Sequence, residues 1–456
     1  MEQFRKDFPA LQQQRDGKAP IYMDSACTTL VPRPVIDAIH EYYTDYPGCG
    51  GRRSHHWFAE AVTSRIESTA TGVPDGAPSG NGVPAPRGSR RLIADFINAR
   101  SEKEILFTLN TTHALNTVAL GFNFREGDVV LLTDREHNSN LIPWLRLQAQ
   151  GRIRVEHVPM GADETFDLAA LEQKLKSGRV RLVSMAYTSN FTGYTIPAGE
   201  IIRLAHRYGA RVMLDAAQAV PHRKVDVAAL DVDFFAFSLH KMCGPRGLGV
   251  LYAKSELLTP PAQDTGATAE VTDRLDPSIL GGGTVADASY EAYGLLAAPE
   301  SFEAGIPNYP AEIAAGATVR YLDGIGMERI AEQERQLNEY LTQELLNRYG
   351  DTSWFRIFGP QDAAQRGGVL TFEVRRPNST GIATELDRRN NIMIRDGVFC
   401  VHSYFNAQFG QGWIRPKSHR DHRMIYRVSL YFYNTIDECR TFVETLDEIF
   451  TERCYV

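Results

Sequence analysis

One lysine stands between an apolar segment and a turn rich in glycine and proline. Lys241 follows residues 233–237, which are typical of a buried strand, and precedes the segment 244–249 (Gly-Pro-Arg-Gly-Leu-Gly). Burial disfavours the charged form of a lysine and lowers its pKa. A neutral lysine amine is the group that forms Schiff bases with carbonyl compounds. Most lysines at strand ends keep their ammonium in water, so whether Lys241 forms a Schiff base depends on the residues around it.

Polar residues follow three other apolar segments. Asp215 ends one of them, and an aspartate there could keep the ring nitrogen of pyridoxal phosphate protonated. The segment 110–113 (Asn-Thr-Thr-His) precedes an apolar helical pattern, and a helix N-terminus with hydroxyl side chains can bind phosphate. His137 could stack on a planar cofactor or move protons. Each residue alone has a more common structural explanation. The aspartate could cap a helix or form a turn, the threonines could be N-caps, and the histidine could be an ordinary loop residue.

Short apolar segments alternate with amphipathic stretches through the first two-thirds of the chain. This alternation predicts strands joined by helices, hence a largely parallel sheet covered on both faces. Ligands of such sheets bind at the carboxyl ends of the strands, where Lys241 and Asp215 stand. The amphipathic stretch 200–208 is one predicted helix. The predicted strands are 104–107, 129–133, 180–187, 211–214, 233–237 and 248–252.

A second region, from about residue 302, has the pattern of a smaller α+β domain. A long amphipathic helix is predicted over 327–348 and a final helix over 436–450. Between them, apolar segments at 369–374, 392–394 and 425–432 predict strands.

The order of these motifs resembles the class V aminotransferase group of fold-type I pyridoxal-phosphate enzymes. Within that group the pattern is most similar to the SUF-type (group II) cysteine desulfurases, relatives of selenocysteine lyase. The resemblance begins at residues 22–26 (Tyr-Met-Asp-Ser-Ala), continues through 302–308 and ends at 427–435. It implies an α/β fold of type I, with a mainly parallel, seven-stranded sheet in a large domain and a smaller α+β C-terminal domain. The implied segments are 1–22 (packing on the small domain), 23–301 (large domain) and 302–456 (small domain).

The resemblance also implies a cofactor, pyridoxal 5'-phosphate, and a role for each matching residue. Lys241 would bond to the cofactor and move protons, Asp215 would pair with its ring nitrogen, and His137 would stack on its ring. Gln218 would bond its phenolic oxygen. The residues that would hold the cofactor's phosphate are Thr111, Thr112, Ser238, His240 and, from a second subunit, Thr284.

The implied partners follow from the same resemblance. A Thr284 contributed by another subunit implies a homodimer with composite active sites. The residues that would bind the substrate are Asn190 and Arg427, which hold its carboxylate, and His55. Arginine suits that task because its planar guanidinium binds a carboxylate at two points. The substrate would be L-cysteine or L-selenocysteine, and a sulfur-acceptor protein would take the product sulfur.

Cys400 determines the expected reaction. It lies in a segment that resembles the family's Arg-x-Gly-x-His-Cys, and a thiolate there can take sulfur from a bound cysteine as a persulfide, leaving alanine. The expected function is therefore that of a cysteine desulfurase supplying sulfur for iron–sulfur cluster or other assembly. A C–S or C–Se lyase on the same fold and a non-catalytic scaffold are the alternatives. The other five cysteines are predicted to be buried structural thiols: Cys27, Cys49, Cys243, Cys439 and Cys454.

Three features depart from the family pattern. Phe399 stands where the family has a histidine, which makes His402 the nearest candidate to supply a proton. The stretch 401–426 is longer than in group II enzymes and includes a basic cluster at 415–423. It is either a loop that carries Cys400 outward or a solvated insertion. The Gly/Pro-rich segment 71–89 is predicted to be a surface loop, either a mobile insertion or a flap near a substrate entrance.

Composition excludes several other classes of function. With 456 residues, 49 Lys+Arg and 56 Asp+Glu, the formal charge is −7, which argues against nucleic acid or an anionic membrane as the main partner. No apolar run approaches the roughly 20 residues that span a bilayer. The N-terminus lacks an apolar secretory core, and no cysteines have a metal-ligand spacing. A cytoplasmic enzyme with reduced thiols and no metal is expected.

Overall fold

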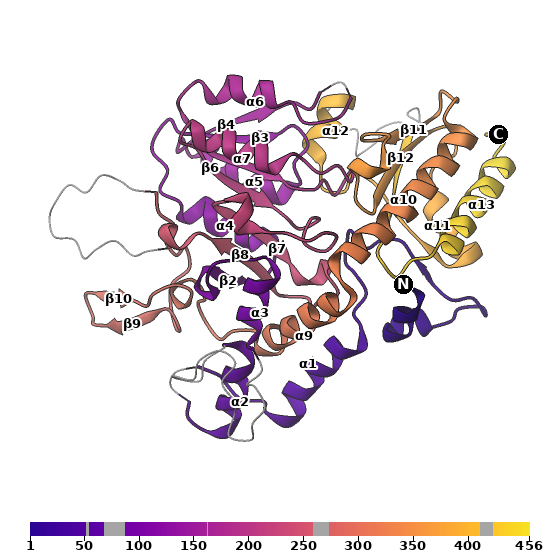
Figure 1. The fold of residues 1–456 in the computed structure, drawn as a ribbon. Coiled ribbons are helices and arrows are strands. Elements are labelled where there is room, and N and C mark those ends of the chain that lie inside the picture. The colour runs from indigo at the N-terminus through magenta and orange to yellow at the C-terminus, as the bar shows by residue number, and fades with distance from the viewer. Residues whose placement is uncertain (52–53, 68–86, 162, 259–272, 411–422) are drawn as a thin grey trace.

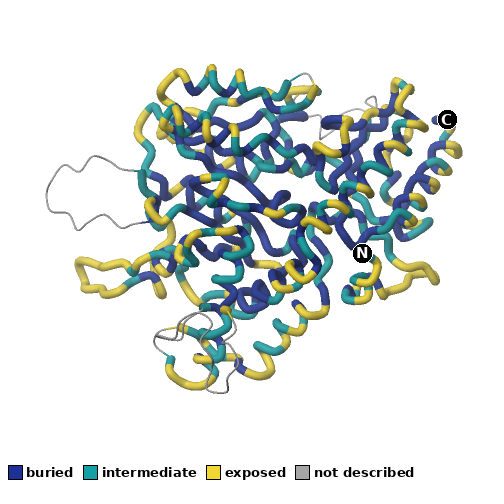
Figure 2. The backbone as a smooth tube through the Cα atoms, viewed as in Figure 1, coloured by how far each residue is buried: buried dark blue, intermediate teal, exposed yellow. Residues whose placement is uncertain are grey.

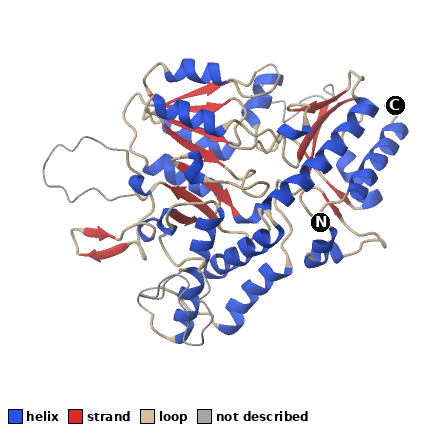
Figure 3. Cartoon of the chain, in the orientation of Figure 1, coloured by secondary structure: helices blue, strands red, loops and turns tan. Residues whose placement is uncertain are grey.

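The computed structural model describes residues 1–51, 54–67, 87–161, 163–258, 273–410 and 423–456. Most of the segment 71–89 and of the basic cluster 415–423 lies outside the described residues. A large sheet with helices on both sides occupies one part of the molecule, and a smaller sheet with its own helices lies beside it (Figure 1, Figure 3). No helix among the described residues has the length and apolar character needed to cross a membrane.

The large sheet has seven strands, of which only β8 runs antiparallel to its neighbours. The remaining neighbouring pairs are parallel. This confirms the predicted fold, and each of the six predicted strands is present with bounds that differ by a residue or less. In spatial order the strands are β2 (Ile105–Thr108), β8 (Gly249–Ala253), β7 (Phe234–Ser238), β6 (Arg211–Asp215), β5 (Val180–Ala186), β3 (Val129–Thr133) and β4 (Arg154–Val158).

The edge strand β4 was not predicted from the sequence. Arg154 and His157 are exposed in it, and only Val158 is buried. An edge strand has a neighbour on one side only, and polar side chains there discourage pairing with other chains. The apolar signal that marks the inner strands is therefore missing in β4.

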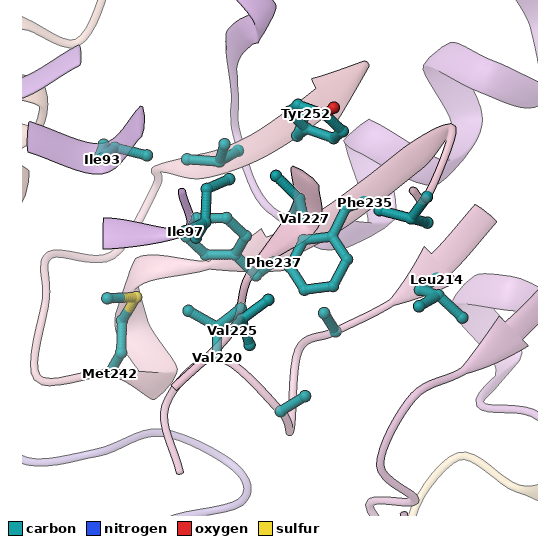
Figure 4. Close-up of a cluster of buried hydrophobic side chains, with 14 of the residues drawn as sticks. Ile93, Ile97, Leu214, Val220, Val225, Val227, Phe235, Phe237, Met242 and Tyr252 are labelled. Atoms are coloured by element: carbon teal, nitrogen blue, oxygen red, sulfur yellow. The ribbon is translucent and has the colours of Figure 1, made fainter. Parts of the chain in front are cut away.

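The inner strands are apolar on both faces because helices cover both. Successive side chains alternate across the sheet, so Val183 and Leu214 join one apolar cluster while Leu182 and Met213 join another. Figure 4 shows part of the first cluster, with Phe235 and Phe237 of β7 between neighbouring apolar side chains. The first cluster also includes α3 (Ser89–Phe96), α6 (Leu168–Leu175), α7 (Ala198–Arg207) and α9 (Tyr309–Ile325), and the second includes α4 (Thr111–Gly121) and α5 (Ile142–Ala149).

The smaller sheet is antiparallel and packs against three helices. Its strands, in spatial order, are β11 (Phe355–Phe358), β12 (Val369–Arg375), β15 (Arg423–Ser429) and β14 (Arg395–Asp396). A separate apolar cluster joins β12 and β15 to the helices. These helices are α10 (Met327–Tyr349), α11 (Ile382–Asn390) and α13 (Ile436–Glu452).

Two observations bear on the predicted segments. In the N-terminal segment, β1 (Ile21–Tyr22) pairs in parallel with β13 (Ile392–Met393), and Arg15 forms an ion pair of 2.8 Å with Asp387. These contacts join it to α11 and to the strand that follows that helix. Helix α9 follows residue 302 in the chain, but its apolar face packs in the cluster of the large sheet, with α3. The division of the chain at 302 remains a prediction.

The two chain ends that flank residues 68–86 are held together by Arg90. This buried guanidinium donates to the Glu67 carboxylate at 3.0 Å and to the Glu303 carboxylate at 2.7 and 2.9 Å. Gly88 allows the close approach, because a Cβ there would lie 2.5 Å from the Ile66 carbonyl oxygen. Helix α2 (Trp57–Ile66) and α3 therefore meet across the start and end of that segment.

A hairpin of β9 (Val285–Ala288) and β10 (Tyr293–Leu295) extends from the body of the molecule. Figure 2 shows the hairpin as largely exposed. Tyr290 at its tip and Tyr293 in β10 are both exposed aromatic residues. Helix α1 (Arg33–Asp45) packs against α9.

Candidate active site

Lys241 ends a short 3-10 turn that follows β7. The turn is fixed by backbone hydrogen bonds, since the Thr29 N–H donates to His240 O at 2.9 Å and the Gly244 N–H to Leu239 O at 2.8 Å. Burial lowers the pKa of Lys241, the nearby Asp215 carboxylate opposes this shift, and the charge of Arg427 adds to it. The turn thus presents a lysine whose neutral amine is favoured relative to a lysine in water.

Asp215 and Gln218 lie at the end of β6, beside β7. The Asp215 carboxylate is buried and accepts one hydrogen bond of 3.0 Å from the Ala217 N–H. Burial raises its pKa, while that N–H and the charge of Lys241 oppose the shift. Gln218 donates from Nε2 to Ala26 O at 2.7 Å. Its buried Oε1 has no partner among the described residues, which leaves an acceptor for a ligand that carries a hydroxyl group.

Hydroxyl groups gather where helix α4 begins. Thr111 and Ser238 are joined by two contacts, from Thr111 N to Ser238 Oγ at 2.7 Å and between the two hydroxyls at 2.6 Å. Asn110 caps the helix by accepting from the His113 N–H at 3.0 Å. Gly249 of β8 allows this helix end to lie against the sheet, because a Cβ there would be 2.5 Å from Asn110 Cα. The result is a helix N-terminus with hydroxyl side chains beside the lysine turn, which suits a phosphate.

Thr112 and His240 lie at the same helix end and the same turn. Thr112 is exposed, and its hydroxyl is 2.7 Å from Ser139 Oγ. Burial, with the charges of Lys241 and Arg246, lowers the pKa of His240 to about 4. Its imidazole is therefore neutral near pH 7. The structure thus brings together all four phosphate-binding residues predicted within one subunit.

His137 follows β3 and faces the charges of this site. Burial is the main cause that lowers its pKa to about 3, followed by the charges of Lys241 and Arg427. Its Nδ1 accepts from the Ser139 N–H at 3.1 Å, so the neutral ring carries its proton on Nε2. Behind it, the buried Glu136 accepts from Thr133 Oγ1 at 2.6 Å and from Asn140 Nδ2 at 2.8 Å. These bonds fix the loop that carries the imidazole.

Arg427 of β15 lies on the small-domain side of the site. The side chain is almost completely buried, pairs with Asp24 at 3.1 Å and donates to Asn190 O at 3.0 Å. Its guanidinium carbon is 4.7 Å from the centre of the Phe399 ring. Burial lowers its pKa and the Asp24 carboxylate opposes the shift. Nε has no partner among the described residues, so part of the guanidinium remains available to a carboxylate.

Cys400 is exposed at the end of a tight turn. Phe399 and Cys400 both have left-handed backbone conformations, with φ of 48° and 61°, which side-chain-bearing residues seldom adopt. The turn is held from outside, because the Asn138 N–H donates to Cys400 O at 2.7 Å and Asn190 Nδ2 donates to Phe399 O at 2.8 Å. A strained turn of this kind persists only where its surroundings impose it.

The expectation of a long loop over 401–426 is wrong for its first part. Residues His402–Phe409 form helix α12, directly after Cys400. Tyr404 and Phe405 of this helix are buried with Phe191 and Phe358 in a small aromatic cluster. The helix has only eight residues, which is too short for its periodicity to reveal it. Cys400 therefore stands between buried Phe399 and a packed helix. Residues 411–422 lie outside the described residues, and the end of the stretch belongs to β15.

His402 is the first residue of α12 and lies beside the loop of His137. Its Nδ1 is 2.9 Å from Asn138 Nδ2, and its charge acts on His137. Phe399, which stands in the position of the family's histidine, is buried beneath the Arg427 guanidinium and has no proton to donate. His402 is thus close to the Cys400 turn through Asn138, as predicted from the sequence order.

The expectation that five cysteines are buried structural thiols is wrong for three of them. Cys243 and Cys439 are buried, and burial raises the pKa of both thiols. Cys49 and Cys454 are exposed, and Cys27 is partly buried. Each of these three lies in a turn or loop, where the apolar context that buries a cysteine is absent.

Arg395 is a site residue that the sequence reasoning did not single out. It stands opposite Arg427 in the pairing of β14 with β15. The pKa of Arg395 is raised overall: burial opposes the shift, and nearby acidic groups, among them Asp24, favour the charged form. The signal was present, since Arg395 is the arginine of the motif that identified Cys400.

Two predicted site residues lie apart from this cluster. His55 is exposed just before α2, and Thr284 precedes β9, where its hydroxyl donates to Gly281 O at 2.9 Å. Figure 1 shows α2 and the β9–β10 hairpin well away from α12 and the ends of β6 and β7. Within one subunit, therefore, neither residue reaches Lys241, and their predicted roles depend on a second copy of the chain.

The residues at the sheet edge fit pyridoxal phosphate. A buried carboxylate with one hydrogen bond (Asp215), a buried acceptor without a partner (Gln218) and a lysine with a lowered pKa surround one position. The hydroxyl-lined helix end suits the cofactor's phosphate, and a neutral His137 suits its ring. Within the part of the chain that the structure describes, no group of three or more His, Cys, Asp or Glu side chains could hold a metal ion.

Comparisons with known proteins agree with this geometry. The Aminotransferase class-V family matches residues 21–75 and 84–442. A cysteine desulfurase of Cronobacter sakazakii is 35% identical, with 98% of each chain covered. The apo structure of a cysteine desulfurase from Thermococcus onnurineus has a TM-score of 0.82 at 33% identity, covering 99% of this chain and 98% of the other. A mutant of C-DES with glycine covalently linked to its PLP cofactor shares the fold, with a TM-score of 0.73 at 20% identity over 97% and 98% of the two chains.

Proposed function

The chain belongs to the Aminotransferase class-V family, and we propose that this cysteine desulfurase carries the sulfur of L-cysteine as a persulfide on Cys400 and releases L-alanine. The observation that supports the persulfide is the position of Cys400. Its thiol is exposed and fixed in a turn held by Asn138 and Asn190, and the neighbouring Phe399 ring packs against the Arg427 guanidinium of the site. A scaffold without catalysis would not need this arrangement.

Pyridoxal phosphate is the cofactor, and it acts as an electron sink for the amino acid bonded to it. We propose that Lys241 holds it covalently between turnovers and that Asp215 and Gln218 bind its ring. The Thr111 and Ser238 hydroxyls at the start of α4 would hold its phosphate. His137 would pack on its ring, and the lowered pKa of His137 would keep the imidazole neutral and avoid a second positive charge beside the ring nitrogen.

Arg427 binds the carboxylate of the substrate in this proposal. Its free Nε, and the Nη2 that it otherwise shares with Asp24, form the two-point contact that a carboxylate requires. Asn190 connects this end of the site to the Cys400 turn, because its backbone oxygen accepts from Arg427 and its amide donates to Phe399 O. Binding of the carboxylate therefore sets the substrate's position relative to the thiol.

The Lys241 amine, once released by the substrate, takes the Cα proton and holds it at Nζ. The Cys400 thiolate then attacks the sulfur of the substrate. A bond forms between the two sulfur atoms, the substrate's C–S bond breaks, and its electron pair stays with the carbon, which takes a proton. The balance is L-cysteine plus the Cys400 thiol giving L-alanine plus the Cys400 persulfide, with no external oxidant or reductant.

The proposal extends to partners and location. The exposed aromatic residues Tyr290 and Tyr293 of the hairpin support a homodimer in which the hairpin meets a second copy. An exposed Cys400 persulfide is accessible to a sulfur-acceptor protein, for iron–sulfur cluster or other assembly. A reducing compartment such as the cytoplasm suits an enzyme whose six cysteines are all free.

The test is mass spectrometry of the Cys400 peptide, after incubation with L-cysteine and alkylation that preserves persulfides. The peptide is expected to gain one sulfur atom as alanine forms. Cys400→Ser should lose both, whereas Cys454→Ser, which removes another exposed thiol, should retain both. Full alanine formation by Cys400→Ser would show that the persulfide is not part of the reaction.

A further inference from the structure

Arg135 lies in the loop that carries His137 and contacts helix α12. The His137 loop (residues 134–140) follows β3, and Arg135 stands two residues before the imidazole. Its side chain is buried. The guanidinium carbon lies 4.7 Å from the centre of the ring of Tyr404, which belongs to α12. Arg135 therefore joins the loop beside the lysine pocket to the helix that directly follows Cys400.

Two carboxylates fix the orientation of this guanidinium. Nε donates to Asp134 Oδ1 at 2.9 Å, and Nη1 donates to Glu164 Oε2 at 3.3 Å. The N–H groups of an arginine lie in the plane of the guanidinium, so these bonds use its edge and leave its face for the Tyr404 ring. A cation over an aromatic face is attracted by the ring electrons. The contact with α12 is thus directional.

Glu164 connects the same guanidinium to the smaller sheet. Its carboxylate accepts from Arg356 Nη2 of β11 at 2.5 Å and from the Gly359 N–H at 2.8 Å. Glu164 itself has a left-handed backbone conformation, with φ of 63°. Such a conformation persists in a residue with a side chain only where the surroundings impose it. The position of Arg135 is therefore set by both sheets.

Tyr404 is held by aromatic rings as well as by Arg135. It is buried, and the centre of its ring lies 5.5 Å from that of Phe191 and 5.4 Å from that of Phe405. Phe191 follows Asn190, whose amide holds Phe399 O in the Cys400 turn. A movement of Tyr404 would therefore disturb the packing around the residues that hold this turn.

The His137 loop meets the segment 400–404 at two points. At one end the Asn138 N–H donates to Cys400 O at 2.7 Å, and at the other end Arg135 packs on the Tyr404 ring. One contact alone would let the segment pivot about it, whereas two contacts fix its position and its direction. His137 stands between Arg135 and Asn138 in the loop, so the thiol is placed relative to the imidazole of the site.

We propose that Arg135 is a positioning residue, which holds α12 on the His137 loop and so sets the position of the Cys400 thiol relative to the sulfur of the substrate. This inference rests on the proposed function, because it concerns the formation of the Cys400 persulfide. Arg135 touches neither substrate nor cofactor in this proposal. A misplacement of a reacting group by about 1 Å can lower a rate by about 10²-fold. Loss of the contact should therefore slow sulfur transfer without weakening substrate binding.

The first test compares the first turnover of the Arg135→Ala and wild-type holoenzymes, at a temperature where both are folded. At saturating L-cysteine, alanine and the Cys400 persulfide should form about 10- to 100-fold more slowly in the variant. The concentration of L-cysteine that gives half of the maximal rate, and the visible band of lysine-bound cofactor, should not change. A role in stability alone would lower Tm without this separation of rate and binding.

Two further arginine variants accompany this measurement. Arg135→Lys keeps a positive charge beside Asp134 and Glu164 but lacks the planar face, so it should show a smaller loss of the same kind. It also decides the question if Arg135→Ala does not fold. Arg376→Ala is the matched control, because the Arg376 guanidinium carbon lies 5.3 Å from the ring of Trp354, outside the aromatic cluster of α12. It should react at the wild-type rate.

Substitutions of Tyr404 test whether its contact with Arg135 is responsible. Tyr404→Phe keeps the aromatic face and should retain the wild-type rate, whereas Tyr404→Leu removes it and should slow the first turnover as Arg135→Ala does. Because both changes remove the same contact, the double variant Arg135→Ala/Tyr404→Leu should be no slower than the slower single variant. Multiplied losses in the double variant would show that the two residues act independently, which would overturn the inference.

Amide hydrogen exchange tests the contact without turnover. In Arg135→Ala the amides of residues 402–409 should exchange faster than in the wild type, while those of β12 should not change. An unchanged first-turnover rate, or loss of the visible band together with the rate, would overturn the inference while the desulfurase mechanism stands. If the wild type itself forms neither alanine nor a Cys400 persulfide, the proposed function is wrong, and the inference falls with it.

Discussion

The two halves of the site are built in different ways. The lysine pocket, here Lys241, Asp215, Gln218, Thr111 and Ser238, stands on the ends of buried strands and on the first turn of a helix. The Cys400 turn, residues 397–401, is exposed at its thiol, has two consecutive left-handed residues and is held by hydrogen bonds from distant loops. Proton and cofactor chemistry needs groups removed from water, whereas sulfur delivery needs access. In this chain the residues for cofactor chemistry stand on the large sheet, and the thiol for sulfur delivery stands on a turn.

Lys241→Ala should have the largest effect, because it removes the group on which the lysine pocket depends. Alanine formation is expected to fall by about 10²–10⁴-fold or more, with loss of the visible absorbance of lysine-bound cofactor. Steady-state kinetics and the absorption spectrum check this. Lys224→Ala, at an exposed lysine 3.6 Å from Glu328, is the matched control and should behave as wild type. Retained alanine formation in Lys241→Ala would place the chemistry elsewhere.

Phe405→Ala tests whether distant packing imposes the Cys400 turn. Phe405 is fully buried against Phe191 and Phe358, and its truncation should cost about 3–5 kcal/mol in the free energy of unfolding. At a temperature where the variant is folded, the Cys400 persulfide should be lost while the visible band of the lysine pocket persists. Persulfide and band declining in parallel would mean that the two halves are not separable. Phe4→Ala, in the N-terminal segment, is a control for aromatic truncation.

Arg427→Lys should have a smaller effect, at the contact between the two halves. A lysine keeps the charge beside Asp24 but loses the planar fork, so KM for L-cysteine is expected to rise about tenfold, or about 1.4 kcal/mol. The visible band should not change. A KM equal to that of the wild type would remove Arg427 from carboxylate binding.

The smallest expected effect is the contribution of His137 to the pH dependence of stability. Its pKa is about 3 in the folded protein and 6.5 in water, so the unfolded chain binds more protons between these values. The stability that this residue contributes is complete above pH 6.5 and is lost as the pH falls from 6.5 toward 3. In protein stripped of cofactor, Tm should fall by a few degrees more for the wild type than for His137→Phe between pH 7 and 5. Equal declines would show that His137 is not buried as described.

The sequence predicted more of the lysine pocket than of the Cys400 turn. The strands that carry Asp215 and Lys241 are continuous apolar segments, and the carboxyl ends of such strands meet at one sheet edge. The surroundings of Cys400 come from Phe191, Asn138 and Phe358, which are far away in the sequence and leave no local pattern. For the same reason, helix α12 and the pairing of Arg395 with Arg427 were visible only in three dimensions. Edge strand β4 was missed because its exposed polar residues lack the apolar signal.

The ion pairs of Arg90 make one position of the chain suitable for protein engineering. Glu67 and Arg90 lie on either side of residues 68–86, and their ion pair holds the two chain ends together, with Glu303 as a further partner of Arg90. The distance that an inserted sequence must span is therefore fixed by residues that the insertion does not change. Doubling the length of a flexible connection between fixed ends costs only about 0.6 kcal/mol. A reporter domain or affinity tag placed between residues 68 and 86 should therefore leave the melting temperature of the enzyme nearly unchanged.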